Sequence, residues 1–258
     1  MRVPLSLALV GVGAVAASAL VAHDVSACSC VGPRMAMLTP VRSQAAPLNT
    51  RVRVEVPQHL PRPSFVLRAH RGAVVPTSVT VISGASLDTV ELTPSAALAR
   101  ETRYEVAQID PSAVPSTTVI GTFTTGTATD TVAPKVKSYG TAKTHMNLGH
   151  VGGGMCSIRG PWVVIEGLAV EDPGRPDAEL AYAIWGPDST GKLDTKGPPS
   201  AIYRAHEGRL FIGRTSLCDP REFPLSGPRT TLAIAAVDEA GNRGPERRFT
   251  LDLTRPTP

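Results

Sequence analysis

The four cysteines of this chain, Cys28, Cys30, Cys156 and Cys218, are its best candidates for covalent chemistry. In an exported protein, cysteines are expected to pair as disulfides. Cys28 and Cys30 are too close in sequence to bridge each other easily, whereas Cys156 and Cys218 flank the strands of one predicted domain. We therefore predict a Cys156–Cys218 disulfide and leave the pairing of the other two open. Closing this loop of about 60 residues would contribute on the order of 4 kcal/mol.

A zinc site is the sharpest alternative chemistry. His145, His150 and Cys156 lie on one glycine-rich segment, which reads as a loop from Gly140 to Gly154, and zinc takes imidazole and thiolate ligands. Their spacing matches no compact ligand motif, and an oxidised Cys156 could not bind metal. The prediction is therefore no metal and no cofactor. The alternative is a zinc-binding hydrolase or accessory protein centred on Gly140–Cys156.

Other motifs give no catalytic set. The glycines at 152–154 are not followed by the Lys-Ser/Thr of a phosphate-binding loop, and the chain has no Gly-x-Ser-x-Gly elbow. Asp238 and Asn242 could contact calcium, but Asp-Glu-Ala-Gly-Asn is first of all a turn sequence. A carbohydrate-binding module is a further alternative, since it would use exposed aromatic rings, for which the candidates are Trp162, Trp185, Tyr182 and Tyr203.

The first 27 residues predict export. One Arg precedes an apolar run from Val3 to Ala22, which is rich in Ala and Gly and ends in small residues, as in a signal peptide. The run is also about long enough to span a membrane, but its small-residue exit favours cleavage. Val25–Cys28 further resembles a lipobox, in which Cys28 would be lipidated, although His23 and Asp24 separate it from the apolar run. An ordinary signal peptide ending at residue 27 is the preferred interpretation.

Composition favours a β-protein. The chain has 23 Gly and 24 Pro among 258 residues and only 4% aromatic residues, which disfavours long helices and favours short strands joined by turns. Basic and acidic residues are nearly balanced along the chain, for a formal net charge of +4. Because a nucleic-acid footprint needs clustered Lys and Arg, no nucleic-acid partner is predicted.

Alternating apolar residues predict two β-sandwiches. After an irregular lead-in at 28–45, short strand-like runs between breakers fill residues 46–127, beginning with Val52, Val54 and Val56. Residues 131–256 form a second set, which closes with Thr230–Leu253. This closing segment alternates on both sides of an Asp/Gly/Asn turn and predicts a hairpin with one buried face. The small, polar, proline-terminated segment Gly126–Pro134 is the predicted boundary.

The segments LTPSAALARETRYEV and GTFTTGTATDTVAPKV resemble the C-terminal half of a bacterial immunoglobulin-like domain of the S-layer type. The matching positions are Leu98, Thr102, Tyr104, Val106, Phe123 and Gly126. The resemblance covers about residues 46–127, and a weaker one covers 131–256 through LAIAAVDEAGNRG. It implies tandem immunoglobulin-like antiparallel sandwiches. A Tyr after a sandwich corner can also cap that corner by bonding its hydroxyl to upstream backbone.

These observations predict a non-catalytic exported or cell-envelope protein that acts as a spacer, adhesion or surface-assembly unit. Its location would be extracellular or in the envelope, and periplasmic or tethered to the outer membrane if Cys28 is lipidated. Its partner would be a surface protein or a glycan of unknown identity, with a lipid anchor as the alternative membrane contact.

The predicted bridge can be tested by peptide mapping without reduction, which should recover the peptides of Cys156 and Cys218 joined. Changing both residues to Ser should lower the thermal midpoint of the second domain and leave the first nearly unchanged, because the unfolded chain loses a covalent constraint. Recovery of Cys28 or Cys30 linked to either residue would contradict the assignment.

The N-terminus can be tested by measuring the intact mass of the native protein. We expect a chain that starts at Cys28 without an acyl addition, because His23 and Asp24 interrupt the lipobox pattern. Acyl mass on Cys28, with partition of the protein into membranes, would show instead that the chain is a lipoprotein.

Overall fold

The computed structural model describes residues 35–40, 44–58, 64–84, 87–109, 117–148, 159–173, 180–214, 223–225 and 227–255. Within these ranges all regular structure is β-strand, and the predicted all-β fold class is confirmed. The described residues contain no helix long and apolar enough to cross a membrane. The predicted signal segment, all four cysteines and His150 lie outside the described residues, so what the sequence predicts for them stays a prediction.

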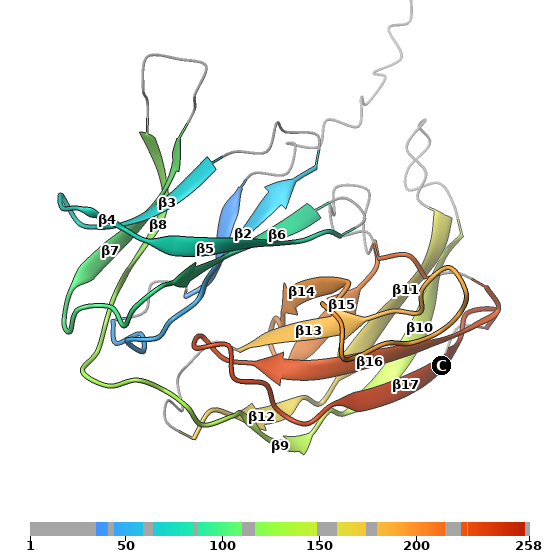
Figure 1. The fold of residues 1–258 in the computed structure, drawn as a ribbon. Helices are drawn as coiled ribbons and strands as arrows, with labels where there is room; N and C mark the ends of the chain where they lie inside the picture. Colours follow the sequence, from blue (N-terminus) through green and yellow to red (C-terminus); the bar gives the residue numbers. More distant parts are fainter. Residues whose placement is uncertain are drawn as a thin grey trace, which may run out of the picture.

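Two four-stranded antiparallel sheets form the N-terminal sandwich, which we define as residues 35–125 (Figure 1). The first sheet has the order β1-β2-β6-β5 and the second the order β4-β3-β7-β8. An immunoglobulin fold places strands A, B, E and D in one sheet and C, F and G in the other, so this order reproduces it with β4 as an added edge strand. The strands are β1 (Ala36–Thr39), β2 (Val52–Pro57), β3 (Ser64–Ala69), β4 (Val74–Val75), β5 (Thr77–Ile82), β6 (Leu87–Pro94), β7 (Arg103–Ile109) and β8 (Thr117–Thr124).

The core of this sandwich follows the alternation in the sequence. Val52, Val54 and Val56 point from β2 into a cluster that includes Phe123 from the opposite sheet. Tyr104, at the start of β7, stacks on Phe123 with the ring centroids 5.6 Å apart. The Tyr104 hydroxyl accepts a 2.9 Å hydrogen bond from the backbone N–H of Ala99, five residues upstream. The predicted tyrosine cap of the corner is therefore present.

A second pair of sheets forms the C-terminal sandwich, which we define as residues 135–255 (Figure 1). Its sheets have the orders β10-β11-β15 and β14-β13-β16-β17, and β9 and β12 form a separate ribbon. This follows the same scheme without a counterpart of strand D among the described residues. The strands are β9 (Lys135–Ser138), β10 (Thr141–Leu148), β11 (Arg159–Glu166), β12 (Ala169–Glu171), β13 (Ala181–Trp185), β14 (Ala201–Arg204), β15 (Arg209–Ile212), β16 (Arg229–Val237) and β17 (Arg247–Asp252).

The sheet β14-β13-β16-β17 is buried on both faces in its two central strands. One side of β16 packs into the C-terminal core through Leu232, Ile234 and Ala236. The other side forms a separate cluster with Leu38 of β1 and Ile82 of β5, and its members from β13, β14 and β16 are Ala181, Ala183, Trp185, Ile202, Ala233, Ala235 and Val237. The expectation of one buried face for the closing hairpin is therefore wrong, because the N-terminal sandwich covers the other face of β16.

Two segments that the sequence analysis predicted to be irregular form strands in the structure. Ala36–Thr39, inside the predicted irregular lead-in at 28–45, forms β1 and pairs antiparallel with β2. Its four residues are too short for a clear period, and pairing with β2 decides their conformation. Thr141–Leu148, within the segment read as a loop, forms β10 and pairs with β11 over its whole length. On β10, Thr144 is buried and Ala142, two residues earlier, packs against the core. Alternate residues therefore face the core as in other strands, but they lie in a mainly polar sequence that does not reveal the alternation.

Arg53 joins the two sandwiches through polar contacts. It points from β2 away from the N-terminal core and is only 1% exposed. Its Nε donates to Glu91 Oε2 at 2.8 Å, and its Nη1 donates to the backbone oxygen of Asp238 at 3.0 Å. Burial lowers the pKa of the Arg53 guanidinium and Glu91 opposes the shift, but arginine stays charged in proteins. The Arg53 charge is thus paired with Glu91 in the N-terminal sandwich and hydrogen-bonded to the backbone of the C-terminal sandwich.

We predict that Arg53→Met destabilises the protein by about 3 kcal/mol, because it leaves the buried Glu91 with only the partly exposed Arg51, 3.2 Å away, as a charged partner. Urea denaturation measures this change. The double variant Arg53→Met/Glu91→Leu should recover much of the loss, since no buried charge remains at this position and Arg51 is 42% exposed to solvent. Arg248→Met is the control, because the side chain of Arg248 is 58% exposed beside Glu246 and such pairs contribute about 0–1 kcal/mol. Equal effects of Arg53→Met and Arg248→Met would contradict the assignment.

Candidate functional site

Three buried carboxylates meet where the two sandwiches join. Asp130 lies in the linker between β8 and β9, Asp172 directly follows β12, and Asp238 directly follows β16. Each offers one carboxylate oxygen, and these oxygens lie within 4.8 Å of one another. The three residues are 8%, 3% and 0% exposed, respectively. Segments that are far apart in sequence thus place three acidic groups together, away from water.

The turn after β16 holds the carboxylate of Asp238. The Asn242 backbone N–H donates to Asp238 Oδ1 and its side-chain Nδ2 donates to Oδ2, both at 2.8 Å. Gly241 has a φ of 87°, and a Cβ on it would lie 2.5 Å from the Arg51 side chain. The positive φ therefore favours glycine here, and any larger residue would also have to displace the Arg51 side chain. The predicted turn chemistry of Asp238–Asn242 is confirmed.

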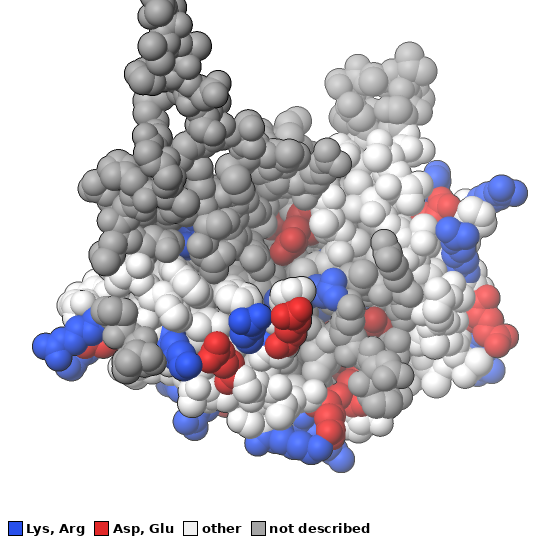
Figure 2. All heavy atoms as spheres, turned by 180° about the vertical axis from the view of Figure 1, so that it is seen from behind, with Lys and Arg blue, Asp and Glu red and all other residues white. Residues whose placement is uncertain are grey.

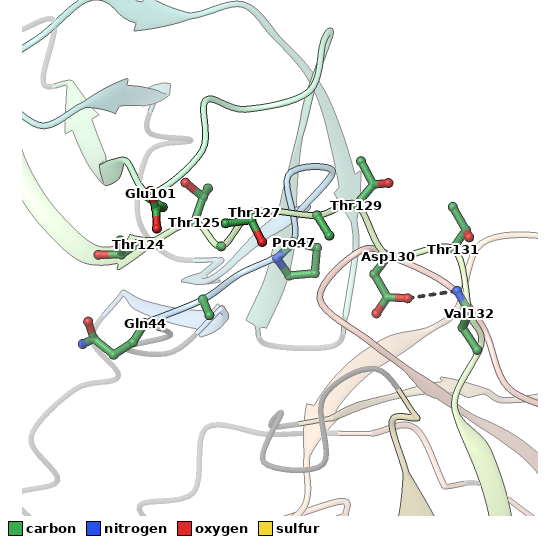
Figure 3. A pocket seen from close by; sticks show the side chains of 13 residues that line it. Gln44, Pro47, Glu101, Thr124, Thr125, Thr127, Thr129, Asp130, Thr131 and Val132 are labelled. Atoms are coloured by element: carbon green, nitrogen blue, oxygen red, sulfur yellow. Dashed lines mark hydrogen bonds between the residues drawn. The ribbon is translucent and has the colours of Figure 1, made fainter.

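Asp130 is held by asparagines from both sandwiches. Its backbone N–H donates to Asn49 Oδ1 at 2.9 Å, and its backbone oxygen accepts from Asn49 Nδ2 at 2.7 Å and from Asn242 Nδ2 at 3.2 Å. Its Oδ1 accepts a 2.9 Å bond from the Val132 N–H (Figure 3). Its Oδ2 is buried and has no hydrogen-bond partner. The backbone of Asp130 is therefore fixed, while one carboxylate oxygen is left unsatisfied.

The electrostatics of this cluster disfavour three free negative charges. Burial raises the pKa of the Asp238 carboxyl, and the Asn242 hydrogen bonds oppose this shift. The carboxylates of Asp130 and Asp172 raise the same pKa further. Arg53 reaches Asp238 only at its backbone oxygen, and its Nε is bonded to Glu91. Like-charged groups this close favour a bound proton or a nearby cation.

A groove of about 740 Å³ runs along the linker on the N-terminal side of this cluster (Figure 3). Threonines and backbone from residues 124–132 form much of its wall, and Gln44, Pro47 and Glu101 lie along the same groove. Its described lining includes no histidine, cysteine or lysine. Its titratable side chains are thus Glu101 and Asp130, which do not make a nucleophile–base pair.

The structure tests the segment of the zinc alternative only in part. His145 lies on β10 opposite Trp162 of β11, and their rings stack with centroids 4.2 Å apart. His150 and Cys156 lie outside the described residues, as does the predicted disulfide between Cys156 and Cys218. The zinc alternative and the disulfide therefore stay predictions.

Three of the four aromatic candidates for sugar binding are buried. Trp185, Tyr182 and Tyr203 are each at most 5% exposed. Trp185 donates from Nε1 to the Gly197 oxygen at 3.0 Å, and the Arg243 guanidinium lies 4.0 Å from its ring centroid. These rings stabilise the sandwich and cannot present a stacking face to a glycan. Trp162 is only half-buried, so it is the one candidate of the four whose ring reaches the surface.

Sequence analysis identified Asp238 and Asn242 but not their partners. Asp130 lies in the predicted boundary segment Gly126–Pro134, and sequence analysis did not single out Asp172. The available signal was weak: Asp172 and Asp238 each directly follow a strand, and Asp130 lies in the linker that follows another. Nothing in the spacing of 130, 172 and 238 indicates that these strand ends meet.

No protein-family model matches the chain, and no curated protein matches it. Among solved structures, it is similar to a pullulanase from Anoxybacillus sp. LM18-11 at 10% identity, with 83% of this chain and 25% of that chain covered and a TM-score of 0.24. The same pullulanase complexed with maltotriose gives 9% identity, 84% and 25% coverage and a TM-score of 0.25. This chain therefore spans about a quarter of those chains.

The Clostridium thermocellum CbhA fibronectin(III)-like modules are similar at 8% identity, with 85% of this chain and 94% of that chain covered and a TM-score of 0.25. These TM-scores are too low to support an argument about fold or function. The strand order and packing given above therefore define the fold.

Proposed function

We propose that this chain is a non-catalytic structural unit of the extracellular space or cell envelope, which acts as a rigid spacer, adhesion or surface-assembly module. The observation that carries this proposal is the burial of β13 and β16 on both faces. A sheet that contributes to two hydrophobic clusters at once is expected to hold the two sandwiches in one fixed orientation. Fixed orientation is what a spacer or assembly unit needs.

The contacts across the junction support this rigidity. Ile82 and Leu38 of the N-terminal sandwich pack with the alanines of β13 and β16, whose short side chains let the sheets approach closely. Beside this apolar contact, the Arg51 N–H donates to the Glu239 oxygen at 2.7 Å, and Arg53 donates to the Asp238 oxygen. Apolar and polar contacts thus restrain the same junction, and relative domain motion is opposed.

Charges of both signs are mixed on the described surface. On the face shown in Figure 2, the described acidic and basic side chains lie next to one another and neither sign gathers into one large patch. Several are paired, as in Lys143 with Glu166 at 2.9 Å and Arg243 with Glu246 at 3.0 Å. We further propose that the predicted leader exports the protein. Its partner would be a surface protein or a glycan.

The proposal can be tested by comparing Ile82→Glu with Val81→Glu. Ile82 is 7% exposed at the junction, whereas its neighbour Val81 is 38% exposed. A carboxylate introduced at the buried position should separate the sandwiches without disturbing either core, because an unpaired charge is costly to bury. Small-angle X-ray scattering should therefore show a larger radius of gyration for Ile82→Glu, with Val81→Glu resembling the wild type.

The functional half of this test uses a deletion strain of the native host. Protease treatment of intact cells should remove the protein, which shows that it is exposed at the surface. Wild type and Val81→Glu should restore surface assembly or adhesion, and Ile82→Glu should not. A protein that stays in the cytosol, or full rescue by Ile82→Glu, would overturn the proposal.

A further inference from the structure

The cluster of Asp130, Asp172 and Asp238 is the feature that the proposed function leaves unexplained. Its carboxylate oxygens lie within 4.8 Å of one another, and all three residues are buried. Buried carboxylates normally have a cationic or hydrogen-bonding partner for each oxygen, because an unsatisfied charge is costly. Asp130 is 8% exposed, yet its Oδ2 has no hydrogen-bond partner. An unsatisfied, buried oxygen on one member of an acidic cluster points to a ligand that carries positive charge.

We propose that these three aspartates bind a calcium ion at the junction of the two sandwiches. Calcium takes oxygen ligands, and all three ligands here are carboxylate oxygens. Two oxygens on one ion can be separated by at most twice the metal–oxygen distance. This limit is about 4.6–5.2 Å for calcium but only about 4.0–4.2 Å for magnesium. The three oxygens lie within 4.8 Å of one another, inside the calcium limit, and a set of three carboxylates suits calcium better than magnesium, which usually keeps several waters and one or two carboxylates.

A shared proton is the competing explanation. One proton would reduce three formal negative charges to two, whereas one calcium ion would reduce them to one. A proton would also bridge only two of the three carboxylates. Arg53 attracts the Asp238 carboxylate electrostatically, but its guanidinium hydrogen-bonds to Glu91 and to the Asp238 backbone oxygen and does not bridge the three carboxylates.

The surroundings fit an ion site, because hydrogen bonds fix the positions of Asp130 and Asp238. Asn242 orients both oxygens of Asp238 and also bonds the backbone oxygen of Asp130. Asn49, from the N-terminal sandwich, holds the same backbone unit of Asp130 from the other side. Such outer partners position ligands and raise metal affinity. The ion would thus connect the linker, the end of β12 and the turn after β16.

Calcium binding can be measured on the purified protein after treatment with EDTA, by isothermal titration with CaCl₂ and by thermal denaturation. We expect one ion per chain, with a dissociation constant between about 10⁻⁵ and 10⁻³ M. Calcium at 100 times this constant should raise the thermal midpoint by about 5 °C or more. MgCl₂ at the same concentration should give a clearly smaller rise.

Asp130→Asn is the decisive variant, because the side-chain oxygen of the introduced asparagine can still accept from Val132. It should weaken calcium binding at least about tenfold. Without calcium its stability should equal or exceed that of the wild type, since one repelling charge is removed. Asp88→Asn is the matched control: Asp88 is also 8% exposed, lies on β6 and accepts from Gln58 at 2.9 Å. This control should bind calcium as the wild type does.

Asp172→Asn provides a second test if Asp130→Asn does not fold, and the same loss of binding is expected. The proposal is overturned if about 5 mM CaCl₂, above the expected range, gives neither heat nor a shift in midpoint. It is also overturned if magnesium stabilises as strongly as calcium, or if Asp130→Asn and Asp172→Asn bind calcium normally. Because ion binding is measured in vitro, these outcomes are independent of surface assembly and of the proposed function.

Discussion

The structure depends on the burial of one sheet between two others. β13 and β16 carry apolar side chains on both faces, so each face needs a partner to exclude water. The sheet β10-β11-β15 covers one face, and the N-terminal sandwich covers the other through Leu38 and Ile82. If the sandwiches separated, the second cluster would be exposed to solvent. The hydrophobic effect therefore couples the stability of the two sandwiches and sets their relative orientation.

The polar contacts of the junction are organised around the same strands. The turn that follows β16 accepts the Arg53 guanidinium at the backbone oxygen of Asp238 and presents the Asp238 carboxylate to Asp130 and Asp172. Apolar packing, the buried Arg53–Glu91 pair and the carboxylate cluster therefore share one turn. A cation bound to the carboxylates would stabilise the conformation that Arg53 also recognises. Ion binding and docking of the sandwiches are then linked, because each favours the same position of this turn.

The surroundings of the candidate functional residues, and not their residue types, decide which of them could form a site. Tyr182, Tyr203 and Trp185, which sequence analysis considered for sugar binding, fill the interior and stabilise it. The aspartates, which are ordinary turn residues in sequence, become unusual only because they are buried next to one another. Residue type alone thus overestimated the aromatic rings and underestimated the acids. In this protein, a candidate site is recognised by a buried polar group for which the fold supplies no hydrogen-bond partner, as with Asp130 Oδ2.

The sequence by itself determined the β-class, most strand positions, the Tyr104 corner and the Asp238–Asn242 turn, because each depends on local alternation or turn preferences. It did not determine that β1 and β10 are strands, since their conformation depends on pairing with β2 and β11. It also could not show that the second face of β16 is covered, because alanine suits either a buried or an exposed position. Only the tertiary structure brings Asp130, Asp172 and Asp238 together, since their proximity arises from the docking of segments that are distant in the chain.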